Sequence, residues 1–243
     1  MRIPRIYTDQ PLQAESTVTL GEEPSQHLVK VLRLRPDAHI SLFNGDGRDY
    51  DGQIRTAAKQ GVEVEISKAS AIEPEPPIRF ILGQGISRGE RMDYVIQKAG
   101  ELGVSGFVPL FTERTVVKLK GEKQERRMSH WRRVMIAACE QSGRRFLPVM
   151  EEPTTIEEWV AGLGSSTKLV LDPQAQESLH DLAPPTDTVH LLIGPEGGLC
   201  REELELAQRC GFRGVRLGPR ILRTETAPLA ALAAMQMLWG DFR

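Results

Sequence analysis

The character of the chain changes at residues 72–77, where the sequence Ile-Glu-Pro-Glu-Pro-Pro places three prolines and two acidic residues within six positions. Such a segment favours an extended connector between two packed parts. Before it, short β-type runs at residues 38–43, 48–56 and 62–67 are separated by turn sequences, which is typical of a small β-barrel. After it, apolar runs alternate with helical patterns. The predicted fold class is therefore α/β, a small barrel followed by a mostly parallel sheet with helices on both faces.

The second part contains five apolar runs of strand length and three segments with helical spacing. The runs lie at residues 78–82, 106–110, 168–171, 189–193 and 214–217, and the helical segments lie at 92–102, 131–138 and 227–239. These patterns divide the chain into a barrel domain at 1–72, a linker at 73–77 and an α/β domain at 78–243. The last helix is apolar nearly all round and must be covered on every side, either by a second copy in a homodimer or within one subunit.

One short helix is expected within the barrel part, and we place its start at Ser25. The Ser25 hydroxyl can cap the first turn, and Leu28, Val31 and Leu32 then share one face of the helix. We expect that face to be buried.

Charge is distributed unevenly along the chain, although the formal net charge is only -2. Residues 114–145 contain ten basic and three acidic residues, a net charge of +7, whereas residues 151–209 contain three basic and twelve acidic residues, a net charge of -9. The basic stretch is compatible with a solvated helix face laced with ion pairs, or with a surface that contacts phosphates. Its excess is too large for internal pairing alone, which keeps nucleic acid among the expected partners.

Composition excludes several classes of protein. No run of eighteen apolar residues is present, so a membrane span is not expected. The first residues lack the long apolar stretch of a secretory signal, and the three cysteines are an odd number without a C-x-x-C pair, which favours a cytoplasmic protein. The histidines show no metal-ligand spacing, so no metal is expected. Only 5% of the residues are aromatic, so base stacking is not expected to dominate nucleic-acid binding.

Two glycine-rich loops stand out in the second part. Residues 194–198, Gly-Pro-Glu-Gly-Gly, directly follow a strand candidate, and residues 217–227 lead into the last helix. Ligands bind beyond the carboxyl ends of strands in open α/β sheets, and glycines let the backbone approach a ligand closely. Neither loop matches a P-loop or a Rossmann motif, and Gly83-Gln84-Gly85 is too short to support one. The first loop can also be interpreted as a plain turn, and the second as a helix cap formed by Thr224 or Thr226.

Several motifs stand in order along the chain. They are Arg88-Gly89-Glu90-Arg91-Met92-Asp93, Gln97-Lys98-Ala99, Glu101-Leu102-Gly103-Val104, Glu113-Arg114, Ala138-Cys139-Glu140-Gln141-Ser142-Gly143-Arg144, residues 193–198 and residues 217–227. Together they resemble the ribosomal RNA small subunit methyltransferase E family, which belongs to the SPOUT class of S-adenosylmethionine-dependent methyltransferases. Arg2-Ile3-Pro4-Arg5 and residues 27–33 resemble the PUA-like barrel of that family. Cys200 stands where the family pattern often has a stronger N-cap residue.

The resemblance implies a PUA-like barrel followed by a trefoil-knotted α/β domain, with S-adenosylmethionine as cofactor and 3-methyluridine in 16S ribosomal RNA as product. It also implies a homodimer that completes the active site. In the family, the cofactor pocket is formed by the two glycine-rich loops and by the loop after the strand that ends at Leu171. Carried over by motif, the cofactor contacts fall on Leu171, Asp172, Gly194, Pro195, Glu196, Gly197, Gly198, Leu217, Gly218, Ile221, Leu222, Arg223, Thr224, Glu225, Thr226 and Ala227.

Methylation of uridine N3 requires loss of the N3 proton, either to a base or with donors that stabilise O2 and O4. The candidates to face the uracil are Arg88, Glu101, Arg114, Glu140, Gln141, Arg144 and Arg223, with Glu196 or Glu225 as base. Glu101 and Glu140 can also be interpreted as surface ion pairs with Lys98 and Arg144. The candidates for contacts with the RNA backbone are Arg2, Arg5, Lys30, Arg33, Arg35, Lys118, Lys120, Arg126, Arg127, Arg132 and Arg133.

Two other functions stay open on the sequence. One is an RNA-binding ribosome assembly factor of the same fold with a vestigial pocket, which would bind no cofactor. The other is methylation of transfer RNA, although the barrel and the match at residues 88–103 weigh against it.

Overall fold

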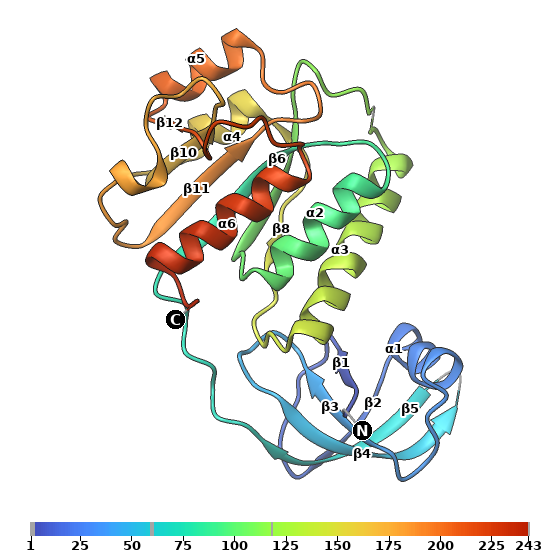
Figure 1. Cartoon of the computed structure of the whole chain (residues 1–243). Coiled ribbons are helices and arrows are strands. Elements are labelled where there is room, and N and C mark those ends of the chain that lie inside the picture. Colours follow the sequence, from blue (N-terminus) through green and yellow to red (C-terminus); the bar gives the residue numbers. More distant parts are fainter. Residues whose placement is uncertain (1–2, 59–60, 118, 243) are drawn as a thin grey trace. The chain divides into compact units, whose positions relative to one another are not determined.

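The computed structural model describes residues 3–58, 61–117 and 119–242 (Figure 1). The chain divides into two compact units. The N-terminal unit consists of the described residues up to Glu75 together with Ile136–Leu147, and the C-terminal unit consists of Pro76–Met135 and the described residues from Pro148 onward. The predicted division into 1–72, 73–77 and 78–243 does not include Ile136–Leu147 in the N-terminal unit. The domain boundaries of that division stay a prediction.

The N-terminal unit contains a five-stranded sheet with the order β1-β3-β4-β5-β2. Its strands are β1 (Arg5–Tyr7), β2 (Ser16–Thr19), β3 (His39–Phe43), β4 (Tyr50–Ala58) and β5 (Gly61–Ala69). All neighbouring strands are antiparallel except β1 and β3. Alternate residues such as Ile40, Leu42, Ile54 and Val64 point inward and are buried in one core. The small N-terminal sheet predicted from the spacing of turns is therefore confirmed.

The short helix of this unit begins earlier than predicted. Helix α1 (Glu22–Gln26) starts after Gly21, so Ser25 lies inside it and does not cap it. The Ser25 side chain is buried, and its Oγ donates to the carbonyl of Leu20 (3.1 Å) and accepts from the amide of Val62 (2.9 Å). Ser25 thus ties the helix to the sheet.

The predicted apolar face of this helix is wrong for two of its three residues. The chain continues from α1 into a π-helical turn, η1 (His27–Val31). Leu28 is fully buried, but Val31 and Leu32 are 65% and 37% exposed. In a π-helical turn each amide bonds to the carbonyl five residues earlier, as Leu32 does with His27 (3.0 Å). The wider turn shifts Val31 and Leu32 away from the face that an α-helical period would give them.

The C-terminal unit contains a sheet in which every strand pair is parallel. The order is β12-β10-β11-β6-β7-β8, and β9 also pairs with β7. The strands are β6 (Arg79–Gly85), β7 (Gly106–Phe111), β8 (Val149–Met150), β9 (Thr154–Thr155), β10 (Thr167–Leu171), β11 (Thr188–Ile193) and β12 (Arg213–Val215). The predicted mostly parallel sheet is confirmed. Ile193 pairs with Gln84, so the loop after β11 starts beside the end of β6.

Helices cover both faces of this sheet, as predicted. They are α2 (Glu90–Glu101), α3 (Glu122–Ser142), α4 (Ile156–Gly162), α5 (Arg201–Arg209) and α6 (Thr226–Trp239), with a 3-10 turn η2 (Leu179–Asp181). Leu191 on β11 packs in one core with residues of α2 and α6, whereas Leu192 packs in another with residues of α4 and α5. Consecutive strand residues point to opposite faces, so α2 and α6 share one face and α4 and α5 the other (Figure 1). Among the described helices, none is both long and apolar enough to cross a membrane.

Helix α6 is covered on one side by its own chain. Ala231, Leu232 and Met235 are fully buried, but Met237 and Leu238 are 65% and 38% exposed. Burial within one subunit therefore does not cover this apolar helix on every side.

Residues 136–147, which include the last turns of α3, belong to the N-terminal unit. Arg5 on β1 donates through Nη1 to the carbonyl of Cys139 (2.7 Å) and through Nη2 to the carbonyl of Arg144 (3.1 Å). The same guanidinium pairs with Asp49 at 2.7 Å. Arg5 thus binds the end of α3 and the residues that follow it to the N-terminal sheet.

Candidate functional site

The two glycine-rich loops meet at the carboxyl ends of β6 and β11. Thr224 Oγ1 donates to the carbonyl of Gly194 over 2.8 Å, which joins the loop before α6 to the loop after β11. Gln84 Nε2 lies 3.2 Å from the same carbonyl and 3.1 Å from Thr224 Oγ1. Residues 194–198 and 217–227 are therefore in direct contact, and we call them together the double loop.

The first half of the double loop requires glycine. The amide of Gly198 donates to the carbonyl of Pro195 (2.9 Å), and Gly198 has a φ of +70°, a conformation that favours glycine. A Cβ on Gly194 would lie 2.8 Å from backbone atoms of Gly198 and Leu199. A Cβ on Gly85 would lie 2.5 Å from Pro195. The loop folds back tightly over the end of β6, which a plain turn would not need.

The second half of the double loop turns Thr224 inward and leaves other residues open. Thr224 is 7% exposed, whereas Ile221 is 83% exposed. Gly218 has a φ of +71°, and the place of a Cβ there is open space. The interpretation of this loop as a side-chain cap is wrong, because the N-cap residue of α6 is Glu225 and its side chain makes no capping bond.

Leu171 and Asp172 lie at the same edge of the sheet as the double loop. Leu171 ends β10, which pairs with β11 on one side and β12 on the other. The amide of Asp172 donates to the carbonyl of Val215 (3.0 Å), and its Oδ1 accepts from the amide of Gln174 (2.9 Å). Because the carboxyl ends of parallel strands meet at one edge, the third predicted cofactor segment lies at this edge too.

Charged side chains hold residues 194–198 from outside. Glu196 Oε1 accepts from the amide of Arg88 (2.9 Å) and from Arg91 Nη1 (3.0 Å), and Arg114 Nη1 donates to the carbonyl of Gly197 (2.7 Å). Burial raises the pKa of Glu196, but the bonds from Arg88 and Arg91 outweigh burial and lower that pKa below its usual value. A carboxylate with a lowered pKa is a weak base, so Glu196 fits a loop-holding role better than removal of a proton from uridine.

Glu101 lies away from the double loop. It ends α2, about 16 Å along the helix axis from Glu90 at the usual rise per residue. Its carboxylate pairs with Lys98 Nζ at 2.7 Å. The ion-pair interpretation of Glu101 therefore fits the structure.

Three other catalytic candidates, Glu140, Gln141 and Arg144, belong to the N-terminal unit. Glu140 Oε1 accepts a hydrogen bond from the amide of Tyr7 on β1 (3.0 Å). Burial raises the pKa of Glu140, and this bond offsets the rise only in part. Glu140 thus acts within its own unit as an acceptor for a strand amide.

The predicted RNA contacts fall into four groups. The guanidinium of Arg5 is engaged inside the N-terminal unit. Three residues of the basic stretch form ion pairs, Arg126 with Glu122 (2.9 Å), Arg127 with Asp93 (3.9 Å) and Arg132 with Glu152 (2.8 Å). The side chains of Lys30, Arg33, Arg35, Lys120 and Arg133 are exposed. Arg2 and Lys118 lie outside the described residues.

Three residues beside the double loop have no counterpart among the predicted site residues. Gln84 is fully buried in β6, Ser87 Oγ lies 3.3 Å from Thr224 Oγ1, and Arg91 binds Glu196. One of them carries a sequence signal, because Gln84 is a polar residue inside the apolar run from Ile81 to Ile86. A polar residue in a buried strand needs a partner, and the sequence alone does not show which one.

Cys200 is the N-cap of α5. Its Sγ accepts from the amide of Glu203 (3.4 Å), and Glu203 Oε2 accepts from the amide of Cys200 (2.8 Å). Glu113, Cys200 and Glu202 also place ligand-type atoms within 4.8 Å of one another. Burial raises the pKa of the Cys200 thiol to about 11. Because metals bind the thiolate, this cysteine suits a capping role.

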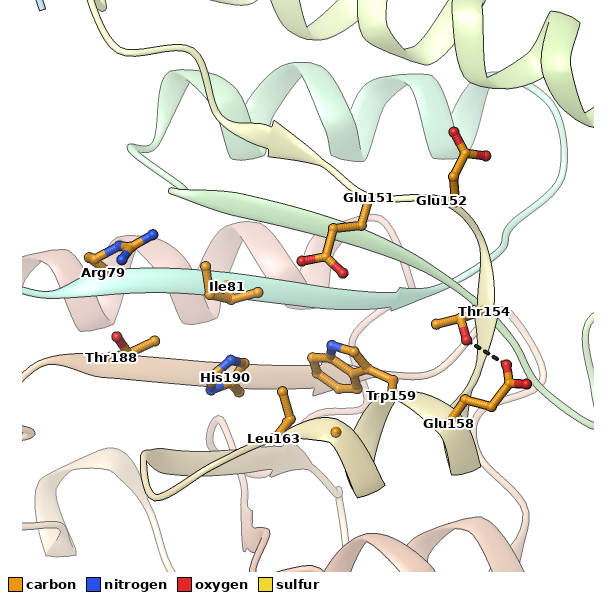
Figure 2. Close-up of a pocket in the computed structure, with 11 residues that line it drawn as sticks. Arg79, Ile81, Glu151, Glu152, Thr154, Glu158, Trp159, Leu163, Thr188 and His190 are labelled. Atoms are coloured by element: carbon orange, nitrogen blue, oxygen red, sulfur yellow. Dashed lines mark hydrogen bonds between the residues drawn. The ribbon is translucent and has the colours of Figure 1, made fainter. Parts of the chain in front are cut away.

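A groove of about 650 Å³ lies between β6, β11 and α4 in the C-terminal unit (Figure 2). Figure 2 shows Trp159 and His190 beside each other in this groove, and their ring centres lie 6.0 Å apart. His190 Nδ1 lies 2.9 Å from Ser166 Oγ. Burial, with help from Lys168 and Arg79, lowers the pKa of His190 from 6.5 to about 4. The groove holds a neutral imidazole and includes none of the residues of the double loop.

Replacing His190 with glutamine is expected to reduce the loss of stability in acid. The folded-state pKa of His190 lies below the unfolded value, so the unfolded chain binds the proton first as the pH falls. The contribution of neutral His190 to the free energy of unfolding is therefore complete above pH 6.5 and is lost as the pH falls toward 4. Discounted for partial exposure, the wild type should lose about 1 kcal/mol more than the variant between pH 7 and pH 4.5.

Urea unfolding at the two pH values measures this difference. The exposed His180, replaced with glutamine, serves as the control and should follow the wild type. An equal loss in the wild type and the His190 variant would show that His190 takes up its proton over the same pH range in the folded and the unfolded protein, and would contradict the lowered pKa.

Comparison with known proteins agrees with this geometry. Residues 74–236 match the model of an RNA methyltransferase domain, and residues 20–67 match that of an RNA methyltransferase PUA domain. The fold and these two matches therefore define the chain as an RNA methyltransferase by class. The ribosomal RNA small subunit methyltransferase E of Buchnera aphidicola (subsp. Schizaphis graminum) is 36% identical over 99% of this chain and 98% of its own. That of Bacillus subtilis is 29% identical over 96% of both chains. The chain belongs to the ribosomal RNA small subunit methyltransferase E family.

Solved structures share the whole fold. A putative methyltransferase from Legionella pneumophila, in complex with bound S-adenosylmethionine, is 39% identical with a TM-score of 0.95 over 100% of both chains. A ribosomal RNA small subunit methyltransferase E from Neisseria gonorrhoeae, bound to S-adenosylmethionine, is 39% identical with a TM-score of 0.93 over 100% of both chains. The predicted fold class, a PUA-like part followed by a SPOUT-type α/β part, is confirmed.

Proposed function

We propose that this protein transfers the methyl group of S-adenosylmethionine to N3 of a uridine in 16S ribosomal RNA of the small subunit. The observation that carries the proposal is the junction of Gly194, Thr224 and Gln84, which joins two glycine-rich loops at the carboxyl edge of a parallel sheet. Ligands bind at this edge in such sheets. The relatives' names support ribosomal RNA as the substrate, and the S-adenosylmethionine in two similar structures supports the cofactor. Uridine N3 as the acceptor rests on the family resemblance.

The residues of the double loop fit a bent sulfonium nucleoside. At Gly198 and Gly218 a Cβ would stand in open space, so an adenine or a ribose can approach the backbone closely there. Half-buried Leu217 and Leu222 offer apolar contacts. The residues proposed to hold the cofactor are 171–172, 194–198 and 217–227. When bound, the cofactor supplies an electrophilic methyl group without help from a metal.

Arginines beside the double loop are the proposed groups that face the uracil. Arg88 and Arg114 adjoin residues 194–198, and Arg223 lies within the double loop itself. All three side chains are exposed, and a guanidinium donates in a planar fork that suits the O2 and O4 atoms of uridine. Donors of this kind stabilise the charge that develops when N3 loses its proton. Glu225 is the remaining candidate base, and it lies 3.9 Å from Arg91 Nε.

A homodimer is part of the proposal. Met237 and Leu238 of α6 are exposed although the helix is apolar, and exposed apolar side chains on one helix face suit a subunit interface. The exposed basic side chains of Lys30, Arg33, Arg35, Lys120 and Arg133 are the proposed contacts with RNA phosphates.

Incubation with labelled S-adenosylmethionine tests the proposed function. The substrates are small ribosomal subunits, naked 16S ribosomal RNA and transfer RNA, and the labelled nucleotide is mapped in each product. The expected result is 3-methyluridine in 16S ribosomal RNA. Label on transfer RNA, or label at another position of the base, would contradict uridine N3 of 16S ribosomal RNA as the acceptor. Absence of cofactor binding would support an assembly factor without methyl transfer.

A further inference from the structure

Three buried polar side chains gather under the double loop. Gln84 is 0% exposed, Ser87 is 2% exposed and Thr224 is 7% exposed. Gln84 lies near the end of β6, Ser87 follows that strand, and Thr224 precedes α6. Gln84 contacts both Gly194, which lies 110 positions later in the sequence, and Thr224, which lies 140 positions later. Polar groups placed this deep in an apolar core need a reason beyond packing.

The orientation of the Gln84 amide is determined by its surroundings. Nε2 lies 3.1 Å from the carbonyl of Gly85, 3.2 Å from the carbonyl of Gly194 and 3.1 Å from Thr224 Oγ1. Two of these three are carbonyl oxygens, which only accept. A flipped amide would place Oε1 against both carbonyls, so the nitrogen must face them.

This orientation leaves the other amide atom without a donor. Oε1 of Gln84 is buried, and within the described part of the chain it has no hydrogen-bond partner. An unpaired buried acceptor destabilises the folded state. An apolar side chain of the same shape would avoid this loss, so the glutamine is not explained by stability.

The acceptors that face Gln84 Nε2 do not depend on it. The carbonyl of Gly194 also accepts from Thr224 Oγ1 (2.8 Å), and the carbonyl of Gly85 also accepts from Ser87 Oγ (3.4 Å). Thr224 Oγ1 in turn lies 3.3 Å from Ser87 Oγ. Removal of the amide therefore leaves each neighbour with a partner. It removes only the restraint that holds the Gly194 carbonyl and Thr224 against the end of β6.

We propose that Gln84 is a positioning residue for the methyl-donor pocket, which fixes the two halves of the double loop relative to each other and so determines the affinity for S-adenosylmethionine. The inference rests on the proposed function, because it takes the double loop as the pocket. It goes beyond the proposed function because it states that one buried amide determines the geometry of the pocket. That amide does not have to contact the cofactor. If the inference is correct, removal of the Gln84 amide weakens the binding of S-adenosylmethionine without lowering the stability of the fold.

The variant Gln84→Met tests this separation. Methionine keeps the length of the side chain and removes both the NH2 group and the unpaired oxygen. The dissociation constant for S-adenosylmethionine, measured by calorimetric titration, should rise at least about tenfold, equivalent to about 1.4 kcal/mol. The melting temperature without ligand should stay within about 2 °C of the wild type.

A second buried glutamine provides the matched control. Gln236 in α6 is 1% exposed, its Nε2 donates to the carbonyl of Leu102 (2.8 Å) and its Oε1 accepts from the amide of Asp241 (3.1 Å). Both of its amide atoms are paired, and it lies nine residues along the chain from Ala227, the last residue of the double loop. Gln236→Met should lower the melting temperature by about 4 °C and leave the dissociation constant unchanged.

The variant Gln84→Glu adds a readout that depends on pH. A protonated carboxyl can donate one hydrogen bond to the Gly194 carbonyl or to Thr224, whereas a carboxylate is repelled by the carbonyls. Binding by this variant should therefore be tighter at pH 5 than at pH 8, in excess of any change in the wild type. Such a rescue requires the hydrogen bond itself.

The outcomes separate this inference from the proposed function. Wild-type affinity in Gln84→Met, or a fall in melting temperature with unchanged affinity, would overturn the positioning role and leave the proposed function intact. A wild type that fails to bind S-adenosylmethionine would overturn the proposed function, and the positioning role with it.

Discussion

Replacing Gly194 with alanine is expected to weaken binding of S-adenosylmethionine by about 100-fold or more. The new Cβ would lie 2.8 Å from the carbonyl carbon of Gly198 and from the amide nitrogen of Leu199, and both are backbone atoms that cannot rotate away. The loop must open, which displaces the Gly194 carbonyl from Thr224. A hundredfold loss corresponds to about 2.7 kcal/mol, within the range that overpacking of a well-packed site produces.

Gly197→Ala is the matched control in the same loop. A Cβ at Gly197 would lie 3.2 Å from Cβ and Cδ of Arg114, a contact that a shift of a few tenths of an ångström relieves, whereas a Cβ at Gly194 would meet backbone atoms at 2.8 Å. The strain at Gly197 is therefore smaller, and the affinity should stay within about threefold of the wild type. Calorimetric titration of the three proteins makes the comparison. If both variants bind as the wild type does, the shape of this loop is not what holds the cofactor.

Replacing Arg5 with methionine is expected to destabilise the N-terminal unit by about 2 kcal/mol, because the charge-assisted hydrogen bonds of its guanidinium are lost. The Arg5 side chain is 11% exposed and its guanidinium lies 4.4 Å from the centre of the Phe43 ring. Without it, the carbonyls of Cys139 and Arg144 each lose a charged donor, although the Cys139 carbonyl keeps the amide of Gly143 (3.1 Å) and Asp49 keeps Arg145 (2.8 Å). Urea unfolding followed by circular dichroism measures the change in the free energy of unfolding.

The exposed Arg33 and Arg35, each replaced with methionine, are the controls and should change stability by less than about 0.5 kcal/mol. The comparison separates two roles of Arg5, because its sequence position also suggests a contact with RNA. An Arg5 variant that unfolds like the wild type but binds RNA more weakly would favour the RNA contact over the structural role.

The parallel sheet was predictable because it depends on local patterns, whereas the meeting of the two glycine-rich loops was implied by the family resemblance. Apolar runs of strand length alternate with helical spacing, and the rule that carboxyl ends of parallel strands share one edge brings residues 194–198 near 171–172. The glycines at 194 and 198 were also informative, since a tight turn and a positive φ are local demands of the backbone.

Other features depend on contacts that a periodic pattern does not contain. Helix α3 is continuous from Glu122 to Ser142, and its spacing does not show that the last turns join the N-terminal unit. Arg5 looks like a surface cation in the sequence, but its partners lie 44 to 139 positions away. Gln84 has a visible signal, yet its acceptors follow only from the fold. The exposure of Val31 was missed because a π-helical turn replaces the α-helical period.

The basic stretch shows why a charge count does not identify a binding surface. The net charge of residues 114–145 is compatible with both ion pairing and phosphate binding. In the structure Arg126 and Arg132 pair with acidic side chains and yet stay exposed, as Lys120 does, so pairing and exposure occur together in this stretch. Pairing depends on the positions of acidic residues such as Glu152, which lies outside the stretch.

A crystal structure of this protein soaked with S-adenosylmethionine tests the central claim most directly. The account predicts density for the cofactor against residues 194–198 and 217–227, with Thr224 still bonded to the Gly194 carbonyl. Density at another place in the C-terminal unit, or a cofactor bound while the two loops stand apart, would contradict it.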